Sequence, residues 1–110
     1  MRKLTIRIPT LFAVLLYSIQ AAAGCLLPAP RSRIPDGSSA TEQDMVAAMR
    51  TLKQYNDDVS EYTKCLEFEQ KRNRISFDDQ ARNRDNALNT LATVAAQFNE
   101  QVRRFKSRRS

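Results

Sequence analysis

Two stretches of the chain carry apolar residues at helical spacing. Within each stretch, gaps of three and four residues separate successive apolar positions. This spacing places the residues on one face of an α-helix. It predicts helices over residues 42–70 and 77–106. The first apolar line consists of Met45, Met49, Leu52, Tyr55, Val59, Tyr62 and Leu66, and the second of Leu88, Leu91, Ala95, Phe98, Val102 and Phe105.

Each predicted helix begins with a hydroxyl residue three positions before an acid. Thr41 precedes Asp44 in this way, and Ser76 precedes Asp79. The hydroxyl oxygen can accept a hydrogen bond from a free backbone N–H of the first turn, and the acid can bond back to the cap. Both helix starts are therefore marked in the sequence.

The connection between the helices is short and polar. Residues 70–74 read Gln-Lys-Arg-Asn-Arg and contain no apolar side chain. Short connections make antiparallel neighbours. The sequence thus predicts an all-α fold, a two-helix antiparallel hairpin over residues 41–106 followed by a basic tail at 107–110. One interrupted helix is the alternative, because no Gly or Pro breaks residues 70–76.

An extended arm is predicted ahead of the hairpin, over residues 25–40. It contains Pro28, Pro30 and Pro35, and proline favours extended backbone. The run Ile34-Pro35-Asp36-Gly37 predicts a turn, with proline at the first central position and glycine free to take a positive φ.

The N-terminus has the pattern of a secretory signal peptide over residues 1–24. Residues 1–7 carry three basic side chains, residues 11–19 are uncharged and mostly apolar, and residues 21–24 are small. The apolar run is short for a membrane span, which takes about 20 residues. We expect an exported protein of the bacterial periplasm or cell envelope. An uncleaved N-terminal membrane anchor is the alternative.

Two cleavage sites compete in this segment. Ala21-Ala22-Ala23 fits the ordinary small-residue site and would release a chain beginning at Gly24. Ala22-Ala23-Gly24-Cys25 resembles a bacterial lipobox, in which Cys25 becomes the first residue and carries lipid on its sulfur. The usual lipobox has Leu where this chain has Ala22.

The two cysteines of the chain are candidates for a disulfide. Disulfides persist in exported proteins, and an even pair favours a Cys25–Cys65 bond. Cys65 lies about 35 Å along the first predicted helix, while an extended arm spans about 50 Å, so the arm can reach back. A lipid on Cys25 would exclude this bond. The other interpretation of Cys65 is a small apolar residue on the helix seam.

Composition argues against an enzyme. The chain has no His, which removes the commonest general base and metal ligand. Two cysteines cannot complete a tetrahedral zinc site. No nucleophile motif or phosphate-binding Gly loop is present. We therefore expect a non-catalytic protein with no cofactor and no metal site.

Positive charge is concentrated at the ends of the chain. The sequence has 18 basic and 12 acidic residues, yet residues 25–100 hold only 10 of the basic ones with all 12 acids. The basic C-terminal end could contact anionic lipid, or could simply complement the helix dipole. Export argues against nucleic acid as the partner. The basic residues concerned are Arg103, Arg104, Lys106, Arg108 and Arg109.

Aromatic residues occupy both apolar lines. Tyr55 and Tyr62 lie on the first, and Phe98 and Phe105 on the second. They form the core of the hairpin or a groove for a partner. Because a chain this small buries little surface, we expect it to need a staple, a protein partner or self-association, such as the pairing of two hairpins into a four-helix bundle.

Three segments together resemble a group of small exported bacterial proteins for which no activity is established. The segments are Ile34–Gly37, the Tyr62 to Cys65 stretch and Val94–Arg103. The resemblance implies export and a two-helix body, and it adds no catalytic residue. This chain departs from the group in its more basic 70–74 turn and in its Arg-rich end.

These features lead to one functional expectation and two alternatives. We expect a small exported cell-envelope protein that binds a protein partner or serves a structural role. The first alternative is a lipoprotein of the outer-membrane type, anchored through Cys25, with its basic tail on an anionic surface. The second is a small exported inhibitor or chaperone-like binder.

Overall fold

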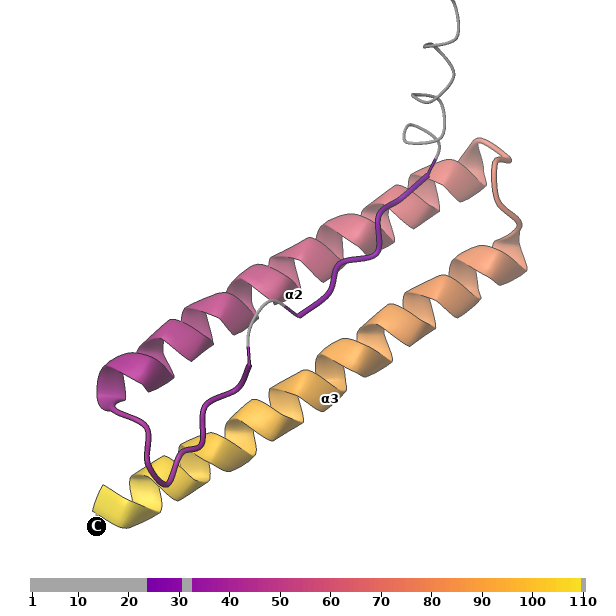
Figure 1. Ribbon diagram of the computed structural model, residues 1–110. Helices are drawn as coiled ribbons and strands as arrows, with labels where there is room; N and C mark the ends of the chain where they lie inside the picture. Colours follow the sequence, from indigo (N-terminus) through magenta and orange to yellow (C-terminus); the bar gives the residue numbers. More distant parts are fainter. Residues whose placement is uncertain (1–23, 31–32, 110) are drawn as a thin grey trace, which may run out of the picture.

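A computed structural model describes residues 24–30 and 33–109 of the chain. This part contains two helices, α2 (Glu42–Lys71) and α3 (Phe77–Arg109). They lie side by side and run in opposite directions, with the C-terminus beside the start of α2 (Figure 1). The predicted antiparallel hairpin is confirmed, and the alternative of one interrupted helix is wrong. Of the predicted signal peptide, only Gly24 lies within the described residues.

Both helices begin where the sequence predicted. The Thr41 hydroxyl accepts from the Asp44 N–H at 3.0 Å, and the Asp44 carboxylate accepts from the Thr41 N–H at 3.0 Å, which completes a capping box. At the second start, the Ser76 hydroxyl accepts from the Asp79 N–H at 3.0 Å. These bonds satisfy backbone donors that a helix start leaves without partners.

A left-handed asparagine ends α2. Asn73 has a φ of 62°. The Asn73 N–H donates to the Gln70 carbonyl at 2.9 Å, and the Arg74 N–H donates to the Glu69 carbonyl at 2.9 Å. This pair of bonds is a Schellman motif, which usually places Gly and sometimes Asn at the left-handed position. The chain therefore turns back without the Gly or Pro that sequence reasoning looked for.

The turn offers a test at Asn73. We expect Asn73→Gly to leave the free energy of unfolding unchanged or to raise it by a few tenths of a kcal/mol, because glycine adopts a positive φ without steric cost. Asn73→Val should lower it by about 1–2 kcal/mol, since a β-branched residue is strained there. Urea unfolding followed by circular dichroism measures both. Equal stability of the glycine and valine variants would contradict this role of Asn73.

The C-terminal helix runs further than predicted. α3 continues through Arg109, three residues beyond the expected end at 106. The Arg108 guanidinium donates to the Ala40 carbonyl at 2.6 Å, so the last turn has a partner in the arm. Basic side chains also favour a helix C-terminus. Most of the predicted basic tail is therefore helix.

The arm crosses the hairpin and contributes to its core. It passes in front of the two helices and turns back beside the end of α3 (Figure 1). Cys25 and Ile34 pack against the two buried clusters, and Ala40 is itself buried. One cluster contains Tyr55, Val59, Tyr62, Leu66 and Ala87, and the other contains Ala40, Met45 and Phe98.

The buried face follows most of the predicted apolar lines but extends beyond them toward the arm. Met49 and Leu88, both predicted on the seam, are 46% and 43% exposed. Ala87 is buried instead, and Val94 packs against the core beside it. The arm covers the helix surfaces that face it, so the buried region extends toward the arm. The opposite edge of each apolar line stays open to solvent.

Neither of the two helices in the described part of the chain is long and apolar enough to cross a bilayer. Charged residues recur along both, so that each helix has a solvated face as well as a buried one.

Candidate functional site: the arm clamp and the open groove

One end of the arm is held by a disulfide. Cys25 is bonded to Cys65 of α2, and their Cα atoms are 5.7 Å apart, within the usual range for a disulfide. The predicted pairing is therefore present in the structure, and Cys65 is more than an apolar seam residue. A lipid on Cys25 would need the same sulfur, so the lipidated and the disulfide-bonded forms exclude each other.

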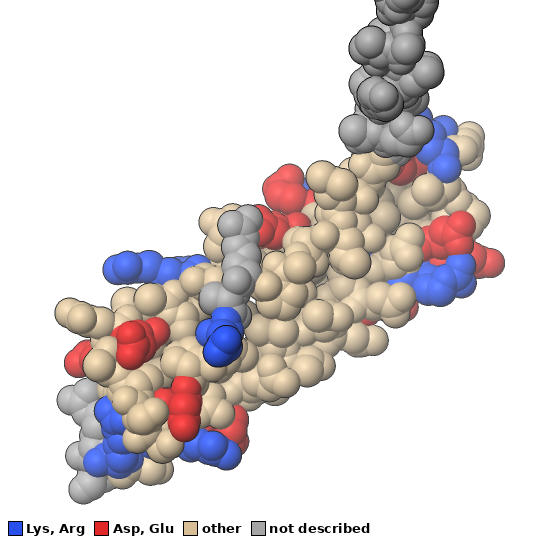
Figure 2. All heavy atoms as spheres, in the orientation of Figure 1, with Lys and Arg blue, Asp and Glu red and all other residues tan. Residues whose placement is uncertain are grey.

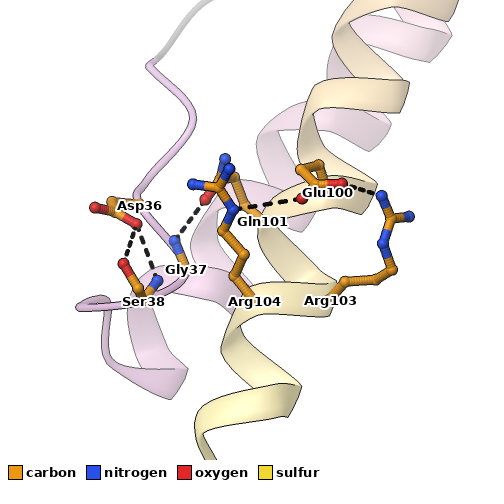
Figure 3. Close-up of polar contacts among 7 residues, drawn as sticks. All are labelled: Asp36, Gly37, Ser38, Glu100, Gln101, Arg103 and Arg104. Carbon is orange, nitrogen blue, oxygen red and sulfur yellow. Dashed lines mark hydrogen bonds and ion pairs between the residues drawn. The ribbon is translucent and has the colours of Figure 1, made fainter.

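The other end of the arm is held by α3 through two hydrogen bonds, which we call the arm clamp. The Gly37 N–H donates to the Gln101 side-chain oxygen at 2.8 Å, as Figure 3 shows. The Arg108 guanidinium donates to the Ala40 carbonyl at 2.6 Å. These contacts join residues 64 and 68 positions apart in the sequence. The arm is thus pinned at both ends across the hairpin.

Gly37 is in contact with the backbone of α3. A Cβ atom built at Gly37 would lie 1.9 Å from the Gln101 carbonyl oxygen and 3.0 Å from the Phe105 nitrogen. Gly37 itself has no positive φ. The prediction that glycine is needed here for its backbone freedom is therefore wrong. Glycine is needed because any side chain would collide with the helix.

The turn before α2 also begins later than predicted. The Asp36 carbonyl accepts from the Ser39 N–H at 3.1 Å and from the Ala40 N–H at 2.9 Å. Asp36, rather than Ile34, is therefore the first residue of the turn, and its carboxylate also accepts from Ser38. The Ser38 N–H and hydroxyl donate to the same Asp36 oxygen at 2.9 and 2.6 Å (Figure 3). Aspartate at the first position of a turn commonly forms such bonds.

These bonds lower the pKa of Asp36 below its ordinary value. The Ser38 hydroxyl has the largest effect and the Ser38 N–H follows, while the charges of Arg104 and Arg108 act in the same direction. A carboxyl whose pKa is depressed on folding stabilises the fold above its unfolded pKa. That contribution disappears as the pH falls through the folded pKa.

We therefore expect acid to loosen the turn that begins at Asp36. As the pH falls below about 4, protonation of Asp36 should loosen the turn, and hydrogen exchange at Ser38 and Ala40 should quicken. In Asp36→Asn this acid dependence should be absent from the two amides. An unchanged acid dependence in the variant would assign it to another group.

The C-terminal basic residues divide into two sets. Arg103 and Arg104 both donate to Glu100, the latter at 3.4 Å (Figure 3). Arg108 bonds to the arm and lies over the Phe105 ring, 4.9 Å from its centre. Lys106 is exposed and has an interaction partner, and the side chain of Arg109 lies outside the described part. The sequence predicted an anionic surface contact here, but not the structural role of Arg108.

An apolar groove runs between the two helices on the side away from the arm. We call it the open groove; its lining residues are Leu52, Lys53, Asn56, Leu88, Leu91, Ala92 and Ala95. Residues of the arm line two clefts together with Thr51 of α2 and a third cleft together with Asp58, and Cys25 of the arm is bonded to Cys65. At about 100° per residue, Asn56 lies about 160° around α2 from Asp58. The open groove therefore lies on the face of the hairpin opposite the one seen in Figure 2.

The face that carries the arm is different in character. Figure 2 shows a broad uncharged surface along its middle, acidic side chains on its upper edge, and Lys, Arg, Asp and Glu at both ends. Pro30 and Ile34 of the arm line an apolar cleft there together with Tyr55 and Phe98, and Ile34 packs against the cluster that contains Phe98.

Most of the aromatic residues on the predicted apolar lines are buried in the core of the hairpin. Tyr55, Tyr62 and Phe98 are buried, and Phe105 packs beside Phe98. They form the core rather than a partner groove. What sequence reasoning missed is the surface that could take a partner, because Met49 and Leu88 were assigned to the seam.

Among the residues described, no group of three or more acidic, cysteine or histidine side chains is arranged to hold a metal ion. Comparison of the chain with protein-family models, with curated proteins and with solved structures found no match.

Proposed function

We propose that this chain is an exported protein of the bacterial cell envelope that acts without catalysis, by binding a protein through the open groove. The observation that carries the proposal is that the arm lies over one side of the hairpin and leaves a mainly apolar groove open on the other. Leu88 lines this groove and is 43% exposed. Exposed apolar surface of this kind marks interaction sites.

The location rests on two features. The leader-like N-terminus supports export. The Cys25–Cys65 bond supports an oxidising compartment, because cytosolic thiols are kept reduced. Together they favour the periplasm or envelope.

Cell fractionation followed by mass spectrometry of the N-terminus tests the location. We expect an envelope fraction, a chain that begins at Gly24 or Cys25, and a mass lower than that of the reduced chain by two hydrogen atoms. An acylated Cys25 would instead establish the lipoprotein alternative. An intact chain with two free thiols in the cytosol would overturn the proposal.

Binding through the groove is tested by photo-crosslinking in cells. A photoreactive residue at Leu88, inside the open groove, should give a discrete protein adduct after illumination. The matched control is Phe68, an apolar residue that is 53% exposed on α2 and does not line the groove. Adducts from neither position, or equal adducts from both, would contradict the proposal.

A further inference from the structure

We propose that the open groove is the interface of an antiparallel homodimer, in which a second copy of this chain closes the groove and completes a four-helix bundle. This inference rests on the proposed function, and it names the partner.

The groove has the composition of a helix-packing surface. Leu52, Leu88 and Leu91 supply large apolar side chains, while Ala92 and Ala95 of α3 have small ones. Small residues let a second helix approach closely, and larger neighbours pack around them. Leu88 is 43% exposed in the groove, where a partner helix would cover it.

The side of the hairpin that carries the open groove is large enough for a partner of the same length as the hairpin. Helices of 30 and 33 residues are each about 45–50 Å long, and two of them side by side are about 20 Å across. The outline of the face is thus about 900 Å², large enough to hold an interface that buries roughly 800 Å² of accessible surface per partner. A second hairpin matches this length and width along its whole extent.

The distribution of charge selects an antiparallel arrangement. The half of the hairpin next to the turn, residues 57–92, has eight acidic and six basic residues. The other half, residues 42–56 and 93–109, has three acidic and seven basic residues. Two copies with their ends reversed place each basic half over an acidic half, whereas copies with matching ends oppose like charges.

One pair of residues fits this arrangement in detail. Asp85 and Arg103 are 18 positions apart on α3, which is five full turns, so they lie on one side of the helix with Ala92 between them. Both are exposed. A two-fold axis near residue 94 brings Asp85 of each copy opposite Arg103 of the other. The pair is therefore made twice in one dimer.

Sedimentation velocity of the oxidised protein, expressed from its full reading frame, tests the dimer. We expect a concentration-dependent species of twice the chain mass. Ala92→Glu should weaken association at least about ten-fold, because it places a charge in the apolar interface. The matched control Ala47→Glu changes an exposed alanine of α2 outside the groove and should leave association unchanged. Circular dichroism checks that both variants keep the hairpin.

Charge reversal tests whether the two copies are antiparallel. Arg103→Glu and Asp85→Arg should each weaken the dimer, and the double variant should recover most of the lost affinity. Weakening without recovery would overturn the antiparallel arrangement. A monomer at about 100 µM, where an interface of this size is populated, would overturn the dimer itself.

The crosslinking experiment separates this inference from the proposed function. An adduct from Leu88 with the mass of two chains supports the dimer. An adduct with a different protein, together with a monomer in sedimentation, overturns the dimer and leaves groove binding intact.

Discussion

Cys65→Ser lowers the free energy of unfolding by about 4 kcal/mol, the largest loss that we expect from a single substitution. The bond closes a loop with a sequence separation of 40, and in the chain-entropy model a loop of that length contributes about 4 kcal/mol. A hairpin of two helices has a small core, so this is a large part of its stability. Urea unfolding of the variant and of the wild type measures the difference.

The bond, rather than either side chain, is responsible for this effect. Cys25→Ser should therefore match Cys65→Ser, and the double variant should be no less stable than either. Reduced wild-type protein should unfold at the same urea concentration as the variants. If the reduced protein kept the stability of the oxidised one, the disulfide would not constrain the unfolded chain as argued.

The same substitution has a local consequence. Without the bond, the N-terminal end of the arm loses its covalent link to α2, while the arm clamp at Gly37 and Ala40 remains. The backbone NMR order parameters of Leu26 and Leu27, which are already 85% and 65% exposed, should fall more than that of Ala40.

Local signals in the sequence were sufficient for the two helices. Gaps of three and four between apolar residues define their extent, and the residues at 41 and 76 mark their starts. Such features depend on neighbours within one or two turns, so one sequence reveals them. The disulfide was also predictable, since the chain has only two cysteines.

Long-range contacts of the arm were not predictable in this way. Nothing near Gly37 in the sequence indicates that it touches Gln101, because the contact depends on how the arm crosses two folded helices. For the same reason Met49 and Leu88 were assigned to the seam. Periodicity defines an apolar face about a quarter to a third of a helix wide, and only the position of the arm decides which edge of it is buried.

The open groove follows from that displacement. Had the two helices packed along the predicted lines, Leu88 would lie between them. Because Cys25, Ile34 and Ala40 fill one side, the buried surface extends toward the arm and apolar residues are left on the other. The surface on which the proposed function depends is therefore a consequence of the arm, and changes that release the arm should alter it.

After Cys25→Ser, Gly37→Ala should be the most damaging substitution in the arm, with a loss of about 2–3 kcal/mol in the free energy of unfolding. Its Cβ would lie 1.9 Å from the Gln101 carbonyl oxygen, a backbone atom that cannot turn aside. The arm must then move off α3 and lose the 2.8 Å hydrogen bond to the Gln101 side chain. Urea unfolding measures the loss, and hydrogen exchange at Ala40 locates it.

Two variants separate the collision from the hydrogen bond. Gly24→Ala is the matched control, since nothing lies within 4 Å of its added Cβ, and it should change stability by less than about 0.5 kcal/mol. Gln101→Ala removes the acceptor but not the backbone oxygen, so it should lose only about 1 kcal/mol and should not rescue Gly37→Ala. Rescue in the double variant would mean that the side chain of Gln101, rather than the close approach of the two backbones, makes glycine necessary at position 37.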